Sequence, residues 1–258
     1  LESIRENYDF ISSRMQDMPP RHRSLRAVFN YSWGLLQPEH QKAFRLLAVF
    51  VGAFSVEAAV EVCGTTRADL NMLAAHSLIN QVDDECYRLH PLLRQYAEEQ
   101  LQDELDSLRA RHLAYFAGYA ERQFALIKSS AQKNALDEVQ TKFPNLRAAW
   151  AWGLAHPGYD ALLSLANLLY LYLEIRGLNY DAVQIFQRAV DAFQLEGSPV
   201  QGIPAELAAA LLGYYGLFSS RFGQSETGES ALRRALDIAE KNGLKSQEAF
   251  ALSKLVAG

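Results

Sequence analysis

The stretch that decides the fold reads Leu78-Ile79-Asn80-Gln81-Val82-Asp83-Asp84-Glu85-Cys86-Tyr87-Arg88-Leu89. Apolar and β-branched residues on both sides of the polar Asp83-Asp84-Glu85 predict two antiparallel strands joined by a turn. Short helical patterns come before this stretch, and an amphipathic helix comes directly after it. Helices followed by a β-hairpin predict a winged-helix domain, which we place at residues 21–105.

The helices before the hairpin are predicted from apolar residues that recur every three or four positions. Residues suited to helix starts agree with this pattern, because Ser24, Ser55 and Thr66 can accept hydrogen bonds from first-turn N–H groups and Pro38 fits a first turn. Gly64 suits a helix end. The predicted helices cover residues 24–36, 38–51, 55–63 and 66–75, and a lead-in helix over residues 1–20 ends at Pro19-Pro20.

The sequence after His90 predicts helices and no further strand. Apolar spacing predicts helical hairpins that form a linker over residues 106–158. Pro144 is expected to divide this linker, so that a new helix opens at Asn145 and ends near Pro157-Gly158. The fold class expected for the whole chain is therefore mainly all-α, with one hairpin in the winged-helix domain.

The last hundred residues contain a repeat, in which small and apolar residues recur with an offset of 46. Small residues inside a helical hairpin let its helices approach closely, as in tetratricopeptide arrays, whose period is about 34 residues. We place the extra residues, roughly 12 relative to that period, within 197–204 and expect a superhelix of tetratricopeptide-like hairpins over residues 159–258, truncated at its end. The matching positions are Gly177, Ala182, Phe186 and Ala189, and Gly223, Gly228, Leu232 and Ala235.

The composition is that of a globular protein, with 49% hydrophobic and 21% charged residues. A net charge of −5 and a pI near 5.7 argue against a protein whose main role is to neutralise nucleic-acid phosphates. Cys63 and Cys86 lack metal-ligand spacing, which indicates buried thiols in a reducing cytoplasm. No signal peptide, membrane span or initiator methionine is visible, and we expect the chain to be the middle of a longer cytoplasmic protein.

His90 is the strongest candidate for a functional residue. It stands before Pro91 at the start of the helix after the hairpin, where free backbone N–H groups and the positive end of the helix dipole favour phosphate. The chain has no G-x-x-x-x-G-K-[ST] loop and no strand-linked G-x-G-x-x-G, so the nucleotide would have to be held elsewhere. The alternative is a histidine that only caps the helix through its backbone.

The winged-helix part resembles the corresponding part of bacterial signal-transducing ATPases of the NB-ARC (STAND) class. The segments after it resemble the linker that leads into a tetratricopeptide sensor in those proteins. The resemblance is carried by Arg23-Ser24-Leu25-Arg26-Ala27, Tyr31-Ser32-Trp33, Leu35-Leu36, Phe44-Arg45-Leu46-Leu47-Ala48-Val49-Phe50, Gly52-Ala53-Phe54, Glu57-Ala58-Ala59, Leu89-His90-Pro91-Leu92-Leu93-Arg94-Gln95-Tyr96-Ala97, Arg111-His112-Leu113-Ala114-Tyr115-Phe116 and Pro144-Asn145-Leu146-Arg147-Ala148-Ala149-Trp150.

This resemblance implies a function for His90. It implies an upstream nucleotide-binding domain in the same chain that holds ADP or ATP with Mg, with residues 1–20 as the tail of its helical subdomain. It also implies that His90 reaches the β-phosphate of ADP and restrains the winged helix. Pro91 stands where the family has an acidic residue, so this position supplies no carboxylate. The fragment itself is expected to bind no cofactor.

DNA binding is the alternative function of the winged helix. A recognition helix over residues 65–77 would need side chains that read bases in the major groove, and Arg67 and Asn71 are the candidates. The turn at Asp83, Asp84 and Glu85 is acidic and would repel phosphates. We therefore do not expect direct nucleic-acid binding by this region.

The repeats are expected to bind a protein, a peptide or a small-molecule inducer. Tyr170 and Tyr214 are the candidate contacts in the concave groove of the array, although their default role is helical core. A freestanding tetratricopeptide scaffold that binds peptides remains a further alternative. No catalytic constellation and no metal-ligand cluster appears in the sequence, so we expect a regulatory and interaction region rather than an enzyme.

Overall fold

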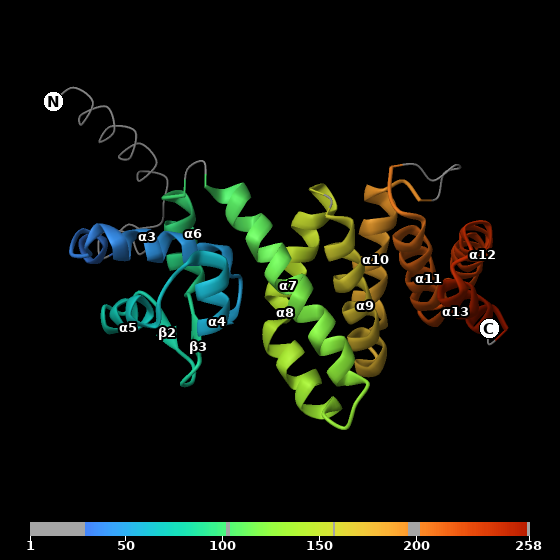
Figure 1. Cartoon of the computed structure of the whole chain (residues 1–258), viewed down its shortest axis with the longest axis horizontal. Helices are drawn as coiled ribbons and strands as arrows, with labels where there is room; N and C mark the ends of the chain where they lie inside the picture. Colours follow the sequence, from blue (N-terminus) through green and yellow to red (C-terminus); the bar gives the residue numbers. More distant parts are fainter. Residues whose placement is uncertain (1–28, 102–103, 157, 196–201, 257–258) are drawn as a thin grey trace. The chain divides into compact units, whose positions relative to one another are not determined.

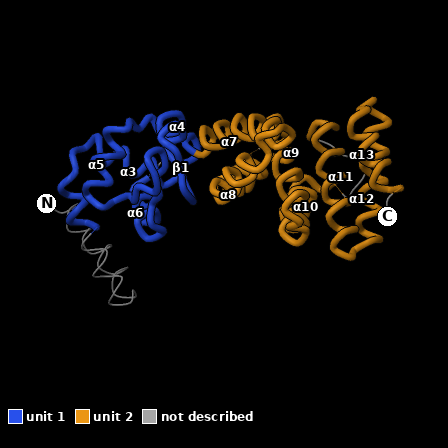
Figure 2. Tube along the Cα trace, turned by 90° about the horizontal axis from the view of Figure 1, so that it is seen from below, with its two compact units in different colours: residues 1–108 blue, residues 109–258 orange. Residues whose placement is uncertain are grey.

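The computed structural model describes residues 29–101, 104–156, 158–195 and 202–256. The chain folds as two compact units, residues 1–108 and residues 109–258 (Figures 1 and 2). The described part is mainly helical, as predicted, with short strands in the first unit alone among the described residues. The predicted lead-in helix over residues 1–20 and the cap at Ser24 lie outside the described residues, and the predicted domain limits remain predictions.

The first unit has the element order of a winged helix. Residues 29–34 are helical, and the sheet order of the strands described there is β1-β3-β2, with antiparallel pairs. The elements are α3 (Pro38–Leu46), the 3₁₀ turn η1 (Leu47–Val49), β1 (Ala53–Ser55), α4 (Val56–Ala58) continuing into the π-helical η2 (Ala59–Cys63), α5 (Arg67–Ala75), β2 (Asn80–Gln81), β3 (Cys86–Arg88) and α6 (Pro91–Glu99).

Strand β1 corrects the prediction of a single hairpin. Its three residues pair with β3 from Ala53 opposite Arg88 to Ser55 opposite Cys86. A strand of this length shows no periodicity of its own, and its partner lies more than thirty residues later in the sequence. The pairing therefore comes from tertiary structure, which local sequence patterns do not report.

Local capping explains why the helix limits around η2 and α5 agree with the sequence. The Ser55 hydroxyl accepts a hydrogen bond from the Ala58 N–H at 3.1 Å. Gly64 ends η2 in the left-handed region at φ +67°. Thr66 and Asp69 form a capping box at the start of α5. These side-chain and backbone preferences act within a few residues, so the sequence alone predicts them.

Stacked aromatic rings form much of the core of the first unit. Phe50 and Phe54 stack with their ring centroids 4.6 Å apart, and Phe54 stacks on Tyr87 of β3 at 6.4 Å. Leu70 and Leu73 on α5 are fully buried. Burial of these side chains stabilises the first unit, because apolar area removed from water is the main stabilising term in folding.

The second unit consists of helices in its described part (Figure 1). Most of α7 belongs to this unit, and α8 to α13 follow. Their bounds are α7 (Leu105–Ile127), α8 (Gln132–Ala155), α9 (Tyr159–Arg176), α10 (Asn179–Ala192), α11 (Ala205–Arg221), α12 (Ser225–Asn242) and α13 (Lys245–Val256).

Pro144 does not divide the linker, and the predicted helix start at Asn145 is wrong. Helix α8 runs through Pro144 without interruption. The missing N–H leaves the carbonyl of Gln140 without its helical donor, but Gln140 is exposed and water can replace it. Val139 and Leu146 are both fully buried on the same stripe, so packing on each side of Pro144 offsets its cost of about 3 kcal/mol.

The predicted repeat corresponds to two successive helical hairpins. Helices α9 and α10 form the first, and α11 and α12 form the second. Gly177 and Gly223 follow α9 and α11 with φ of +67° and +91°, which favours glycine at both turns. The six other repeat positions are buried, as the pattern predicts: Ala182, Phe186, Ala189, Gly228, Leu232 and Ala235.

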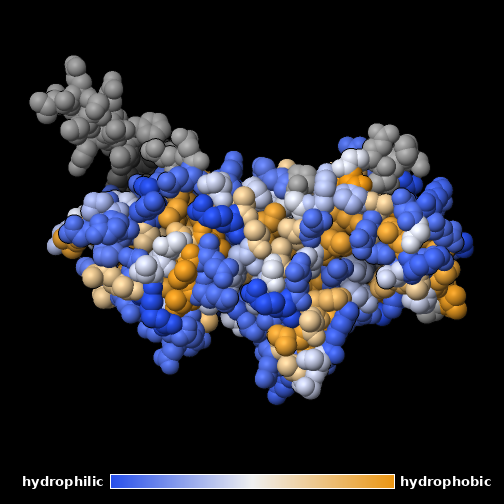
Figure 3. Space-filling model, viewed as in Figure 1, coloured by the Kyte–Doolittle hydropathy of each residue, from blue (hydrophilic) through white to orange (hydrophobic). Residues whose placement is uncertain are grey.

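Hydrophilic residues cover much of the face seen in Figure 3, and apolar residues appear between them in small areas. None of the helices described in the structure combines the length and the apolar composition that crossing a bilayer requires.

Candidate functional site

His90 lies between β3 and α6, as the N-cap residue of that helix. Its backbone is extended, with φ −65° and ψ 140°, and its side chain is exposed. The Nδ1 atom accepts a hydrogen bond from the Leu92 N–H at 3.3 Å. A neutral imidazole that accepts at Nδ1 carries its proton at Nε2. The side chain therefore caps the helix with one nitrogen and keeps an N–H donor on the other.

The start of α6 offers fewer backbone donors than the sequence suggested. Pro91 has no N–H, the Leu92 N–H is bonded to His90, and the Arg94 N–H donates to the His90 carbonyl at 2.9 Å. Of the first-turn N–H groups, that of Leu93 remains as a donor for an anion. An anion at this helix end would therefore depend on the His90 side chain more than on free N–H groups.

Arg88 is a residue that the sequence analysis did not select. Along β3 and the residues after it, Tyr87 and Leu89 are buried whereas Arg88 and His90 are exposed. Side chains alternate along extended backbone, so Arg88 and His90 lie on the same side of the chain. A cation beside an imidazole donor favours an anionic group. The alternation was visible in Tyr87-Arg88-Leu89-His90 and would have identified Arg88.

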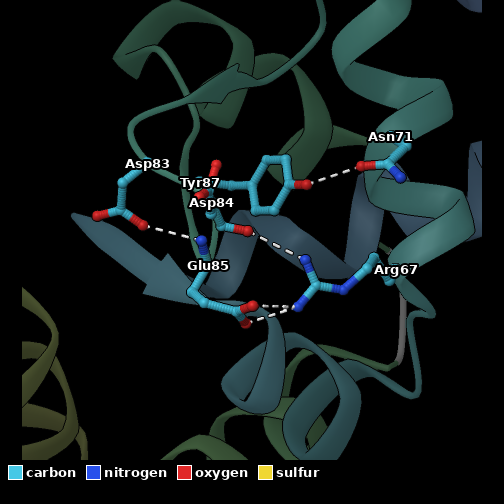
Figure 4. A network of polar contacts seen from close by, with 6 residues as sticks. All are labelled: Arg67, Asn71, Asp83, Asp84, Glu85 and Tyr87. Carbon is cyan, nitrogen blue, oxygen red and sulfur yellow. Dashed lines mark hydrogen bonds and ion pairs between the residues drawn. The ribbon is translucent and has the colours of Figure 1, made fainter.

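The DNA-reading candidates Arg67 and Asn71 are both bonded to the hairpin (Figure 4). Arg67 donates from Nη1 to the Asp84 carbonyl at 3.0 Å and from Nη2 to both carboxylate oxygens of Glu85 at 2.6 Å. The hydrogen bond to Glu85 raises the pKa of Arg67. The Tyr87 hydroxyl donates to Asn71 Oδ1 at 2.8 Å. The two side chains therefore serve contacts within the domain.

The tip of the hairpin is acidic, and hydrogen bonds to Asp83 and Val56 hold its backbone at Glu85. The Glu85 N–H donates to Asp83 Oδ1 at 2.9 Å, and the Glu85 carbonyl accepts from the Val56 N–H at 2.9 Å. Asp83, Asp84 and Glu85 are exposed. These carboxylates would repel the phosphates of nucleic acid, which disfavours the alternative of DNA binding.

Tyr170 and Tyr214 are brought together from α9 and α11. Their rings stack in parallel with centroids 4.3 Å apart, and Phe250 of α13 meets them edge-on at 5.4 and 5.3 Å. The Tyr214 hydroxyl donates to Asn167 Oδ1 at 2.7 Å. Burial raises the pKa of both tyrosines. The two candidates thus form one half-buried aromatic cluster with a third ring that the sequence analysis missed.

Glu174 adds charge beside this cluster. Its Oε1 lies 3.0 Å from Arg221 Nη2 and 4.0 Å from Lys254 Nζ. The carboxylate also bonds to Tyr170. One acidic and two basic side chains, from α9, α11 and α13, therefore border the aromatic rings. Helical spacing from Tyr170 to Glu174, and from Phe250 to Lys254, was the signal that could have grouped them.

His112 on α7 is buried, with 2% of its surface exposed. Burial lowers its pKa to about 4, and a hydrogen bond with Asn145 opposes this shift in part. A neutral, enclosed imidazole of this kind contributes to the core of the second unit.

The described cysteines, Cys63 and Cys86, are not joined in a disulfide, and they are buried and half-buried respectively. Among the residues that the structure describes, no group of three or more His, Cys, Asp or Glu side chains is arranged to hold a metal ion.

Comparison with known proteins relates the chain to transcriptional regulators. No protein-family model matches it. It is 33% identical over 162 residues to proteins of Mycobacterium bovis and Mycobacterium tuberculosis that are provisionally named HTH-type transcriptional regulators. The match covers 58% of this chain but 18% of each relative. The chain thus spans less than a fifth of the length of these relatives.

Among solved structures, the chain matches a Signal Transduction ATPase with Numerous Domains (STAND) protein with a tetratricopeptide repeat sensor from Pyrococcus horikoshii. The identity is 13%, the TM-score is 0.33, and the match covers 88% of this chain and 48% of that chain. A TM-score of this size does not establish a shared fold. What the comparisons show is that the chain is similar to a part of mycobacterial proteins provisionally named as HTH-type transcriptional regulators.

Proposed function

We propose that this chain is the regulatory and interaction region of a STAND-type ATPase and transcriptional regulator. The repeats would sense a ligand or protein partner, and the winged helix would couple that event to an upstream nucleotide-binding domain. The similarity to proteins named as transcriptional regulators supports the regulatory role. The order of a winged helix followed by helical hairpins supports the division into a coupling and a sensing part.

The observation that carries the proposal is the state of His90. Its Nδ1 is held by the Leu92 N–H, which directs the remaining Nε2–H donor away from the helix, and the side chain is exposed. ADP supplies charged phosphate oxygens, which are strong acceptors for such a donor. Arg88, on the same side of the chain, adds a positive charge. The residues present therefore fit a phosphate contact, while Pro91 offers no carboxylate for Mg.

The proposed coupling is a shift in population between two states. In the resting state, His90 holds the winged helix against ADP on the nucleotide-binding domain. A ligand on the repeats would favour a second state in which this contact is lost, and ADP could then exchange. The clustered rings of Tyr170, Tyr214 and Phe250, with Glu174 beside them, are the proposed sensing surface.

The test is the rate of ADP release from the full-length protein that contains this chain. Removal of a hydrogen bond to a charged group costs about 1.5–3 kcal/mol, so His90→Ala should speed ADP release about tenfold to a hundredfold without an inducer. His76→Ala is the matched control, because His76 is an exposed histidine at the end of α5. Equal release from the His90→Ala protein and the wild type would reject the proposal.

A further inference from the structure

Helix α5 holds strand β3 at two points (Figure 4). Arg67 binds Glu85, which directly precedes the strand, and Asn71 binds Tyr87 in its centre. The two helix residues are four positions apart, or about 6 Å along an α-helix. The two hairpin residues are two positions apart, or about 6.6 Å along a strand. The spacings match, so both contacts form on one face of α5.

Strand β3 leads directly to His90. It is the central strand of the described sheet, bonded to β1 on one side and β2 on the other. Leu89, which follows the strand, is buried, and His90 comes next with extended backbone. His90 lies three residues beyond Tyr87, so the strand leads the backbone directly into the N-cap position of α6.

The two contacts differ in strength. Arg67 and Glu85 form an exposed pair, with 47% and 66% of their side-chain surfaces accessible, and pairs of this kind contribute little. Tyr87 is fully buried, and its hydroxyl donates to Asn71 on the exposed side of α5, so removal of the Asn71 side chain would take this acceptor from a buried hydroxyl. A buried polar group without a partner is costly. Asn71 is therefore the stronger tether of the strand.

We propose that Asn71 is a positioning residue for His90, acting through Tyr87 and β3, with Arg67 as a weaker second tether. The inference rests on the proposed function, in which His90 meets a phosphate. Arg67 and Asn71 are the residues that a DNA-binding winged helix would use to contact bases. In the present proposal they hold β3 instead. A movement of α5 would be transmitted along β3 to the imidazole.

The test uses nuclear magnetic resonance on the present chain, without nucleotide. Amide exchange of Leu92, measured relative to Ala97 in the same helix, reports the His90 cap separately from global unfolding. The side-chain nitrogen shifts of His90 report which ring nitrogen carries the proton. Asn71→Ala and Tyr87→Phe should speed Leu92 exchange about threefold to tenfold relative to Ala97 and reduce the share of the Nε2–H tautomer.

Matched variants separate positioning from loss of stability. Asn71→Asp keeps the acceptor for the Tyr87 hydroxyl and should retain the wild-type His90 signals. Met72→Ala changes the next residue, whose side chain is exposed, and should leave both readouts unchanged. Tyr87→Phe leaves no buried hydroxyl without a partner, so the test still holds if Asn71→Ala impairs folding.

The inference is wrong if Tyr87→Phe leaves the Leu92 to Ala97 exchange ratio and the His90 tautomer as they are in the wild type. That result would not affect the proposed function, which is tested by ADP release from the full-length His90→Ala protein. Conversely, unchanged ADP release would reject the phosphate role of His90, while altered His90 signals in the chain would still establish the tether.

Discussion

Gly216 and Gly228 lie against each other where α11 meets α12. A Cβ atom built on Gly216 would lie 2.7 Å from the Gly228 carbonyl oxygen, and one built on Gly228 would lie 2.7 Å from the Gly216 carbonyl oxygen. Both contacts are with backbone, which cannot move aside as a flexible side chain can. The close approach of this hairpin therefore depends on glycine at both positions.

Gly228→Ala should destabilise the second unit by about 3 kcal/mol or more, because the added methyl group also meets the Ser220 backbone nitrogen at 2.7 Å. Thermal and urea unfolding of the variant measure this change. Gly118→Ala is the matched control, since its Cβ would meet only Arg122 Nη1 at 3.7 Å within α7, and it should stabilise by about 0.5–1 kcal/mol. Equal stability of the two variants would show that the helices can separate without cost.

The stability of the second unit should fall with acid because of His112. Its folded pKa is about 4 and its ordinary value is 6.5, so the unfolded state binds the proton first as the pH falls. Stability is fully present above pH 6.5 and is lost progressively toward pH 4, by an amount on the order of 3 kcal/mol for this group.

Unfolding of the His112→Gln protein in urea at several pH values checks this expectation. The substitution removes the titrating group, so the slope of stability between pH 6.5 and pH 4 should become shallower than in the wild type. His76→Gln replaces an exposed histidine and should keep the wild-type slope. An unchanged slope in His112→Gln would mean that other groups cause the acid sensitivity.

The sequence predicted those parts of the fold that local interactions decide. The helix start at Thr66 and the end at Gly64 depend on side-chain caps and a left-handed backbone within a few residues. The repeat glycines were predicted from the 46-residue offset between matching positions. Strand β1 was not predicted, because it pairs with residues far away in the sequence, such as Ala53 with Arg88. The continuous helix through Pro144 was not predicted either, because packing on both sides of the proline stabilises it.

The candidate site also contains one feature that local sequence predicts and others that only the tertiary structure shows. The position of His90 at the start of a helix was predicted from its neighbours and is confirmed, since His90 is the N-cap residue of α6. The contacts of Arg67 and Asn71 were not predicted, because their partners are 18 and 16 residues away in the sequence. In addition, the sequence of a helix does not show whether a polar side chain faces DNA or a neighbouring hairpin. The role of His90 toward a phosphate remains a prediction.

A substitution at the end of α10 should stabilise the protein. Gln194 adopts a left-handed backbone with φ +52°, which glycine tolerates better, and its neighbour Leu195 donates to the Val190 carbonyl at 2.9 Å. Gln194→Gly should therefore raise the free energy of unfolding by about 1 kcal/mol. The reverse change Gly177→Gln, at the equivalent position after α9 with φ +67°, should lower it by a similar amount, as thermal unfolding would show. Changes of the same sign in both variants would contradict this account.

The isolated chain should show no salt-dependent DNA binding at an ionic strength of about 0.15 M. Arg67 and Asn71 are bonded to the hairpin, and the exposed Asp83, Asp84 and Glu85 at its tip would repel phosphates. Glu85→Gln removes the negative charge that pairs with Arg67, and Glu61→Gln makes the same charge change at an exposed residue of η2. Both variants should remain unbound in a mobility-shift titration against a mixed duplex.

The opposite result would be binding by the wild type that weakens steeply with salt and disappears in Arg67→Ala. That result would make the winged helix a DNA-binding domain, and it would require the contacts of Arg67 to open in solution.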